Sequence, residues 1–517
     1  MKNKIKGGGI VKAAGIVSIG TLFSRITGLI RLQIIAYLFG YSPATDAFWL
    51  AFTLPNTLRA LLAEGALSAA FIPVFSEWCS KKGEKEAWRL ANNIFNLLFI
   101  FVSFIVIVGI ISAPFYLPYF AVGFRKNPYQ MNLTIHLTQL MWPFLIFISL
   151  AAIVMAILNC KGHFTYPAFA PVFFNICFIA LAFLLASKFG IYSLAIGVVT
   201  GGILQLLIQI PSLRKIGFKY ELILSLKNEG IIRIFQLLLP AVLGSITLQV
   251  SIIITRIFAS TLPAGSISGL QYAMRLIQFP LGLFPIALST VIFPKLSSLV
   301  AKGNEREVKR MINIGIKLVF FLLIPSSVGM IMLRKQLISI LFQHGAFSYQ
   351  DTLITSGALF YYSLGLFAMG GVMILSRAFY SLQDVTTPFK ISLATLGLNI
   401  ILNFILIGPL KHMGLALATS LSMIFNMGVL GFFLRKKIGK IGGRSILTSF
   451  IKIVFISTIM GGGIYALSVF FASGSSFLSQ ILYILLSLIS GIGIVAGMSY
   501  LLKVEEFKFI LSSLKKS

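Results

Sequence analysis

Apolar runs long enough to cross a lipid bilayer follow one another along almost the whole chain. A helix needs about 20 apolar residues to cross a hydrocarbon core of about 30 Å. Charged residues make up only 11% of the 517 residues and hydrophobic residues 58%, whereas an ordinary globular domain is about 25% charged. The sequence therefore predicts an all-α polytopic membrane protein and excludes an ordinary soluble domain.

These runs predict about 14 transmembrane helices. Their ranges are 13–38, 46–78, 90–116, 131–159, 166–187, 190–212, 231–260, 266–298, 308–333, 352–381, 388–409, 412–434, 446–472 and 477–502. The second would be about 50 Å long, so it must tilt, kink at Pro55 or Pro73, or project beyond the bilayer. Arg25 and Arg31 interrupt the first run and no A-x-A-like site follows, which favours a span over a signal peptide.

The basic residues predict the orientation of the chain. Lys and Arg number 43 against 13 Asp and Glu, a net charge of +30, and such an excess indicates nucleic acid or a membrane surface as the partner. Here the basic residues lie in short loops between apolar runs, so we expect a bilayer and no nucleic acid. They cluster before the first span, after the second, sixth, eighth and twelfth, and at the chain end. The positive-inside rule then places both termini in the cytoplasm.

An internal repeat divides the chain. Residues of the first half recur 221 positions later in one ungapped register, including prolines and a charged loop. Matching pairs are Ser68 and Ser289, Pro73 and Pro294, Lys81 and Lys302, Glu84 and Glu305, Arg89 and Arg310, and Pro167 and Pro388. The repeat predicts two parallel six-helix lobes, 1–221 and 222–442, with two C-terminal helices in 443–517. In transporters built from parallel repeats, the substrate lies between the halves.

Charged residues interrupt the first two spans. Arg25, Arg31, Asp46, Arg59 and Glu64 lie within otherwise apolar sequence, where a charge costs from about 2.5 to over 10 kcal/mol unless it faces a partner or a water-filled cavity. The three arginines outnumber the two acids, so this stretch predicts one wall of a cavity that receives an anion.

A further arginine, Arg275, lies in the eighth span, which is the repeat counterpart of the second. A two-fold arrangement of the halves would bring it opposite Arg59. Guanidinium groups bind phosphate oxygens in a planar, bidentate way, so these arginines favour a phosphate or diphosphate over a cation. The alternative is that some of them reach the membrane surface, or form structural ion pairs with Asp46 and Glu64.

The acidic residues have two interpretations each. Glu64 precedes Gly65 and fits either a gate between the halves or an ion pair with Arg59. Asp46 follows the turn YSPAT and fits the N-cap of the second helix or an ion pair with an arginine. Asp384 lies in a loop, where a cap or turn role is favoured over a coupling-ion ligand.

Metal, cofactor and catalytic sites have little support in the sequence. The four histidines are dispersed, and no His, Cys, Asp or Glu set has metal-ligand spacing. No glycine-rich phosphate loop and no nucleophile–base pair is evident. We therefore expect no enzyme, no metal and no cofactor, although a coupling ion or the membrane potential would drive transport; the potential supplies about 2.3 kcal/mol per charge per 100 mV.

Four segments of the chain carry a family resemblance. With FSRITGLIR, ATDAFWLAFTLPNTLRALLAEGALSAAFIPVF, QYAMRLIQFP and FYSLQDVTTP, the chain resembles the MurJ (MviN-like) family of bacterial lipid II flippases, in the multidrug/oligosaccharidyl-lipid/polysaccharide exporter superfamily. The resemblance implies two six-helix lobes that alternate between inward-open and outward-open states in the bacterial cytoplasmic (inner) membrane. The cargo would be undecaprenyl-diphosphate carrying the disaccharide–peptide wall precursor. Wall-synthesis proteins are further expected partners of what we expect to be a monomer.

The resemblance also implies roles for particular residues. Ser24, Arg25, Arg31, Arg59 and Arg275 would bind the diphosphate, Asp46 and Glu64 would act in gating, and helices 13 and 14 would form a groove for the lipid tail. The chain departs from the family at Leu32, Met274 and Gln278, where many members have acids. These departures put in doubt any mechanism that assigns a proton or an ion pair to those positions.

Three other functions compete with a lipid II flippase. A polysaccharide-unit flippase differs mainly in the headgroup of its cargo. A cation-coupled multidrug exporter would need carboxylates in the cavity, for which only Glu64 and Asp46 qualify. A membrane scaffold or channel would use the arginines only to bind anionic lipid.

Overall fold

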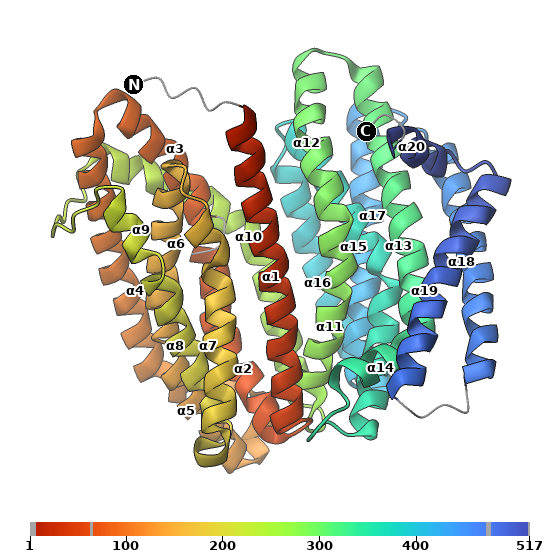
Figure 1. The fold of residues 1–517 in the computed structure, drawn as a ribbon, viewed down its shortest axis with the longest axis horizontal. Helices are drawn as coiled ribbons and strands as arrows, with labels where there is room; N and C mark the ends of the chain where they lie inside the picture. Colours follow the sequence, from red (N-terminus) through yellow and green to blue (C-terminus); the bar gives the residue numbers. More distant parts are fainter. Residues whose placement is uncertain (1–6, 63–65, 472–476, 515–517) are drawn as a thin grey trace. The chain divides into compact units, whose positions relative to one another are not determined.

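The structure, a computed structural model, describes residues 7–62, 66–471 and 477–514, which form helices and loops without a β-strand. The chain divides into two compact units (Figure 1). Unit 1 comprises Met1–Ile267 and Gly345–Phe347, and unit 2 comprises Ser268–His344 and Ser348–Ser517.

The described residues of unit 1 form ten α-helices and one short 3-10 helix. These are α1 (Gly7–Phe39), α2 (Pro43–Leu62), α3 (Ala66–Lys81), α4 (Glu84–Phe120), η1 (Val122–Lys126), α5 (Pro128–Met141), α6 (Phe144–Cys160), α7 (Thr165–Phe189), α8 (Tyr192–Leu207), α9 (Ile210–Lys215) and α10 (Glu229–Ser260). The helix α1 packs along α7, and α7 packs along α8.

Unit 2 is organised around its long helix α13. Its helices are α11 (Ser266–Leu283), α12 (Pro285–Ala301), α13 (Glu305–Phe342), α14 (Tyr349–Leu364), α15 (Leu366–Ser381), α16 (Thr386–Leu410), α17 (His412–Ile438), α18 (Gly443–Phe471), α19 (Phe477–Leu501) and α20 (Glu505–Leu514). The helix α13 packs against α12, α14, α15, α18 and α19, so it joins the second repeat to the two C-terminal spans.

Eleven helical segments of the described residues are long and apolar enough to cross a membrane, or 12 if α14 and α15, bent by 42°, form one span. Twelve of the predicted spans correspond to these segments. The other two are 46–78 and 231–260. The former contains residues 63–65, which lie outside the described residues, and the latter is one helix, α10, with a shorter apolar segment at Ile246–Ser260.

The helix α10 belongs to unit 1 by its contacts, although it begins the second sequence repeat. Ile231 and Ile234, each 1% exposed, join a core cluster with Phe71 and Phe75 of α3 and Leu90 of α4. The sequence repeat divides the chain after residue 221, whereas the contacts divide it after Ile267. The apolar face at the start of α10 explains the difference, because it is covered by α3 and α4.

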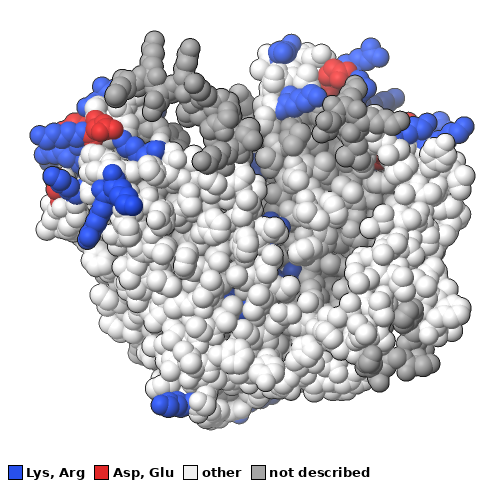
Figure 2. Space-filling view, viewed as in Figure 1, with Lys and Arg blue, Asp and Glu red and all other residues white. Residues whose placement is uncertain are grey.

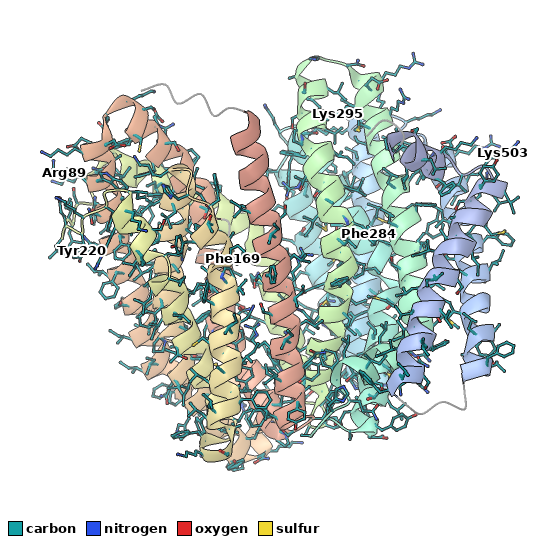
Figure 3. The ribbon with its side chains drawn as sticks, in the orientation of Figure 1. Arg89, Phe169, Tyr220, Phe284, Lys295 and Lys503 are labelled. Carbon is teal, nitrogen blue, oxygen red and sulfur yellow. The ribbon has the colours of Figure 1, made fainter. Side chains whose placement is uncertain are left out.

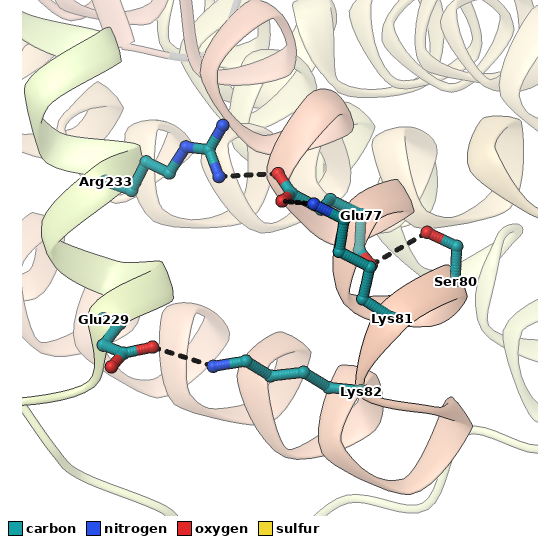
Figure 4. Close-up of polar contacts among 6 residues, drawn as sticks. All are labelled: Glu77, Ser80, Lys81, Lys82, Glu229 and Arg233. Atoms are coloured by element: carbon teal, nitrogen blue, oxygen red, sulfur yellow. Dashed lines mark hydrogen bonds and ion pairs between the residues drawn. The ribbon is translucent and has the colours of Figure 1, made fainter.

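Ion pairs reinforce the attachment of α10 to α3 (Figure 4). Glu77 of α3 accepts hydrogen bonds from Arg233 at 2.6 Å and from Lys81 at 2.8 Å. Next to this group, Lys82 donates to Glu229 at 2.8 Å. In each unit taken by itself, Lys, Arg, Asp and Glu gather mainly at one end of the helices (Figure 2). We call the end of unit 1 that carries these ion pairs its basic end.

The C-terminal helix α20 is attached to unit 2 by polar contacts with two helices. The ammonium of Lys317, whose side chain on α13 is only 6% exposed, lies 2.8 Å from the carboxylate of Glu505. Ser449 of α18 donates to the buried Glu506 at 2.7 Å. A buried ammonium needs a charged or hydrogen-bonding partner, so Glu505 stabilises both α20 and the interior of α13.

We expect Glu505→Gln to loosen α20. A hydrogen bond to a charged group contributes about 1.5–3 kcal/mol, so amide hydrogen exchange in α20 should become about tenfold faster or more. Hydrogen–deuterium exchange with mass spectrometry measures this change. The control is Glu305→Gln, which breaks a surface pair with Lys309 on α13. Equal changes in exchange for the two variants would contradict this account.

Candidate functional site

Arg31 is the most constrained of the α1 arginines. Its guanidinium carbon lies 5.4 Å from the ring centroid of Phe174 and 5.4 Å from that of Phe178, both on α7. A guanidinium group is attracted to the negative face of an aromatic ring, more strongly where water is excluded. The two rings therefore help to orient the Arg31 side chain. Its neighbour Leu32, one of the departures from the family pattern, is 2% exposed.

Ser24 and Arg25 lie nearly two turns before Arg31 on α1. The backbone carbonyl of Ser24 accepts from the side-chain amide of Asn175 at 3.2 Å, which ties α7 to α1, and Arg25 is exposed. The helix runs without interruption through Gly28. Arg25 and Arg31 therefore leave α1 about 120° apart around its axis.

Arg59 lies on α2 and is half-buried. Its Nε donates to the side-chain oxygen of Asn56, one turn earlier, at 3.0 Å. An amide orients the guanidinium group without adding negative charge. Glu64, the predicted partner or gate, lies outside the described residues.

Arg256 of α10 also contributes to unit 1. It donates to the carbonyl of Ile267 at 2.9 Å and lines a small hollow with Leu50, Thr53 and Leu54 of α2. From the sequence alone it reads as an anchor at the membrane surface, because no other charged residue is near it in the seventh span. The residues of α2 that lie next to Arg256 are about 200 positions away in the sequence, so the local sequence around Arg256 does not predict this contact.

Arg275 lies on α11, in unit 2. Its guanidinium group donates to the side-chain oxygen of Gln278 at 3.2 Å. Gln278 and the half-buried Met274 are two of the positions at which many family members have acids. Gln278 thus keeps the geometry of a hydrogen-bond acceptor next to the arginine but supplies no negative charge.

Asp46 is 2% exposed in the first turn of α2. Its carboxylate accepts from the backbone N–H of Gly265 at 2.7 Å. The N-cap alternative for Asp46 is wrong, because Ser42 directly precedes the helix and its hydroxyl accepts from the N–H of Thr45 at 3.1 Å. Asp46 instead joins the start of α2 to the loop before α11.

Gly265 has little room for a side chain. Its φ is +89°, and an added Cβ would lie 1.8 Å from Cδ1 of Tyr41. The loop therefore approaches α2 closely enough to reach the Asp46 carboxylate only because this residue is a glycine.

Asp384 lies in the loop between α15 and α16, and its side chain is 9% exposed. The carboxylate accepts from the N–H and the hydroxyl of Thr387 at 2.9 and 2.8 Å, and from Lys437 of α17 at 2.6 Å. Burial raises the pKa of Asp384, but these hydrogen bonds outweigh burial, so the pKa lies well below its usual range. Asp384, which precedes the N-cap residue Val385, thus binds a first-turn N–H of α16 and ties this loop to α17 by an ion pair.

The described residues hold no group of three or more His, Cys, Asp or Glu side chains placed to bind a metal ion.

We expect Gly265→Ala to destabilise the protein more than Gly83→Ala does. Both glycines have positive φ, +89° and +87°, but nothing lies within 4 Å of a Cβ added at Gly83. The strained backbone is thus common to both variants, and the steric overlap with Tyr41 adds about 1–3 kcal/mol at Gly265 alone. Thermal unfolding in detergent measures the difference; equal losses would show that the loop is not tightly packed on α2.

We expect the contribution of Asp384 to stability to depend on pH. Its folded pKa lies below the unfolded value of about 3.9, so the stabilisation is present above about pH 4 and is lost as the pH falls below it. Asp384→Asn should therefore lower stability at neutral pH by about 1–3 kcal/mol, with a smaller difference in acid. Thermal unfolding at several pH values tests this, with Glu86→Gln as a surface control. If the loss of stability caused by Asp384→Asn becomes larger at acidic pH, the expected pH dependence is wrong.

Comparisons of sequence identify relatives of this chain. A model of the family described as Lipid II flippase MurJ matches residues 35–486. A protein from Buchnera aphidicola subsp. Acyrthosiphon pisum (strain APS), named "Probable lipid II flippase MurJ", is 39% identical over 79% of this chain and 81% of its own length. A Burkholderia cenocepacia protein named "Lipid II flippase MurJ" is 34% identical over 81% of this chain and 82% of its own.

Solved structures agree with the sequence comparisons. A structure described as "Lipid II flippase MurJ, inward closed conformation" covers 94% of this chain and 99% of its own, with a TM-score of 0.78 and 31% identity. An inward-facing MATE transporter of the MOP superfamily shares the fold, with a TM-score of 0.69 at 16% identity over 83% of this chain and 98% of its own. The predicted fold class, an all-helical multi-pass membrane protein, is confirmed. The matched family is one of transporters and not of enzymes, and the chain belongs to this family, the lipid II flippases of the MurJ type.

Proposed function

We propose that this protein moves lipid II from the cytoplasmic to the outer leaflet of the bacterial inner membrane by alternating access, with its arginines binding the diphosphate. The observation that carries the proposal is that arginines lie on the apolar helices α1, α2 and α11 of a chain that belongs to the lipid II flippase family. Arg31 is held by aromatic rings, Arg59 by an asparagine amide and Arg275 by a glutamine amide. A guanidinium group binds phosphate oxygens in a planar, bidentate way, which suits the diphosphate of the cargo.

The same proposal assigns Ser24 and Arg25 to headgroup binding and Asp46 to gating. A carboxylate that is 2% exposed and bound to the Gly265 N–H supports a gating role, because a movement of the loop would break a charge-assisted hydrogen bond. Glu64 is proposed as a gating residue on its sequence position alone.

We propose that α18 and α19 receive the polyprenyl tail. Both helices expose large apolar side chains, among them Tyr465, Val469, Ile489 and Ile492. The tail of the cargo is a hydrocarbon chain, which such a surface would cover without burying polar groups.

The orientation with both termini in the cytoplasm is part of the proposal. It is supported by the gathering of charged side chains at one end of each unit (Figure 2) and by the positive-inside rule. A potential that is negative inside favours outward movement of the anionic headgroup by about 2.3 kcal/mol per charge per 100 mV.

We expect Arg31→Ala, Arg59→Ala and Arg275→Ala each to lower the rate of flipping by about tenfold or more, because each removes hydrogen bonds to a charged ligand worth about 1.5–3 kcal/mol. The flipping rates of the corresponding Arg→Lys variants should lie between those of the Ala variants and the wild type, since lysine keeps the charge but not the bidentate geometry. The measurement is the fraction of lipid II on each leaflet in cells depleted of the wild-type protein, using an externally added enzyme that cleaves exposed precursor.

The matched control is Arg89→Ala, which removes a surface arginine, 56% exposed, from its pair with Glu86. This variant should restore the wild-type leaflet distribution. If all three Ala variants restore it as well, the arginines do not bind the diphosphate. If depletion leaves lipid II correctly distributed but traps another lipid-linked sugar inside, the cargo is a polysaccharide unit.

A further inference from the structure

The connection between α9 and α10 is held against α4 by three buried asparagines. We call residues 218–227 the clipped linker. Asn92 donates to the carbonyl of Lys219 at 2.9 Å and accepts from the N–H of Glu221 at 3.0 Å. Asn93 likewise donates and accepts, whereas Asn96 donates to two carbonyls. The bonds are from Asn93 to the Ser225 carbonyl at 2.8 Å, from the Ser225 N–H to Asn93 at 2.9 Å, and from Asn96 to the carbonyls of Glu221 at 2.9 Å and Ile223 at 3.2 Å.

This arrangement turns a row of apolar side chains outward. The asparagines bind the backbone at the odd-numbered positions 219, 221, 223 and 225. The even-numbered side chains are Tyr220, Leu222, Leu224 and Leu226, which are 61%, 74%, 52% and 68% exposed. The asparagines themselves are at most 3% exposed. Three buried amides thus stabilise a conformation that would be unfavourable in water, because it leaves four large apolar side chains uncovered.

The apolar row continues an exposed apolar surface of α4. The ring of Tyr220 packs edge-on against Phe95 of α4 at 6.3 Å. Beyond Phe95, α4 exposes Phe99 and Phe104 within a span of high mean hydropathy, 3.0. Figure 3 shows Tyr220 at the outer edge of unit 1, near Arg89 at its basic end.

Basic residues flank the row on both sides. Lys219 and Lys227 are exposed at the two ends of the clipped linker, and Arg214 and Lys215 are exposed just before it. A tyrosine and leucines next to lysines and arginines are typical of segments that lie in the interfacial region of a bilayer. A lysine near an anionic membrane surface contributes to the attraction of such segments.

We propose that the clipped linker is a membrane anchor: its apolar row inserts into the headgroup boundary of the leaflet at the basic end of unit 1, and its lysines bind anionic phospholipid headgroups. The anchor fixes the connection between the two sequence repeats at the bilayer surface. The proposal requires only that the chain spans a membrane and does not depend on which cargo it moves.

The test places an environment-sensitive fluorophore on single cysteines of the full chain, after Cys79, Cys160 and Cys177 are replaced by alanine. The labelled positions are Leu222→Cys and Leu224→Cys, with Phe104→Cys as the lipid-embedded control and Lys85→Cys as the aqueous control. The protein is placed in nanodiscs of phosphatidylcholine with or without phosphatidylglycerol. Quenching is measured with lipids that carry a spin label near the headgroup or near the end of the acyl chain.

We expect the fluorophores at 222 and 224 to be quenched by the shallow label and much less by the deep one, whereas the fluorophore at 85 is quenched by neither. Phosphatidylglycerol should increase the shallow quenching, and Lys219→Gln with Lys227→Gln should abolish this increase. Quenching at 222 and 224 no greater than at 85 overturns the anchor. Protection of these positions from both lipid-borne and aqueous quenchers also overturns it, because a protein surface would then cover the row. An absence of any effect of phosphatidylglycerol overturns the role of the lysines.

A second variant tests the asparagines. Asn93→Ala removes both bonds to Ser225, so the amide of Ser225 should exchange its hydrogen about tenfold faster, and shallow quenching at 224 should fall. Faster exchange without a fall in quenching would show that the asparagines do not hold the row in place. The quenching at 222 and 224 in the otherwise unchanged chain decides the proposal even if Asn93→Ala does not fold.

Discussion

The cost of a polar group that has no partner in hydrocarbon is the constraint on which the described structure depends. Lys317, inside the longest helix of unit 2, meets the carboxylate of Glu505. Asp46 meets a backbone N–H, and Arg31 meets two aromatic rings. In each case the partner comes from another part of the chain, so the requirement to satisfy a charge also fixes how the helices pack.

The packing of side chains assigns helix α10 to unit 1, whereas the sequence repeat assigns it to the second half of the chain. A parallel repeat suggests that α10 should pack with the helices that follow it in sequence. Its buried isoleucines and the pairs Arg233–Glu77 and Lys82–Glu229 place it on α3 and α4 instead. The repeat in the sequence and the compact units in space therefore describe different properties: the first records similarity between segments, and the second records which apolar faces cover one another.

Much of the architecture follows from the sequence, because hydropathy over about 20 residues is a local signal. The arginines on α1, α2 and α11 were also visible, since a guanidinium group in an apolar run is conspicuous. What the sequence did not reveal is which distant group each polar residue meets. The N-cap of α2 is Ser42 and not Asp46, and the asparagines of α4 bind a linker more than 120 positions away. Such pairings depend on how distant segments pack in the folded chain, and no local sequence pattern predicts them.

The membership of α10 in unit 1 bears on how the chain can be divided for expression in pieces. A fragment that stops at the end of the first sequence repeat would lose Ile231 and Ile234, each 1% exposed, and would leave the facing surfaces of α3 and α4 without their cover. It would also leave Glu77 without Arg233. A fragment that extends through Ser260 retains both. An N-terminal fragment meant to fold independently should therefore end after α10 and not at residue 221, where the sequence repeat ends.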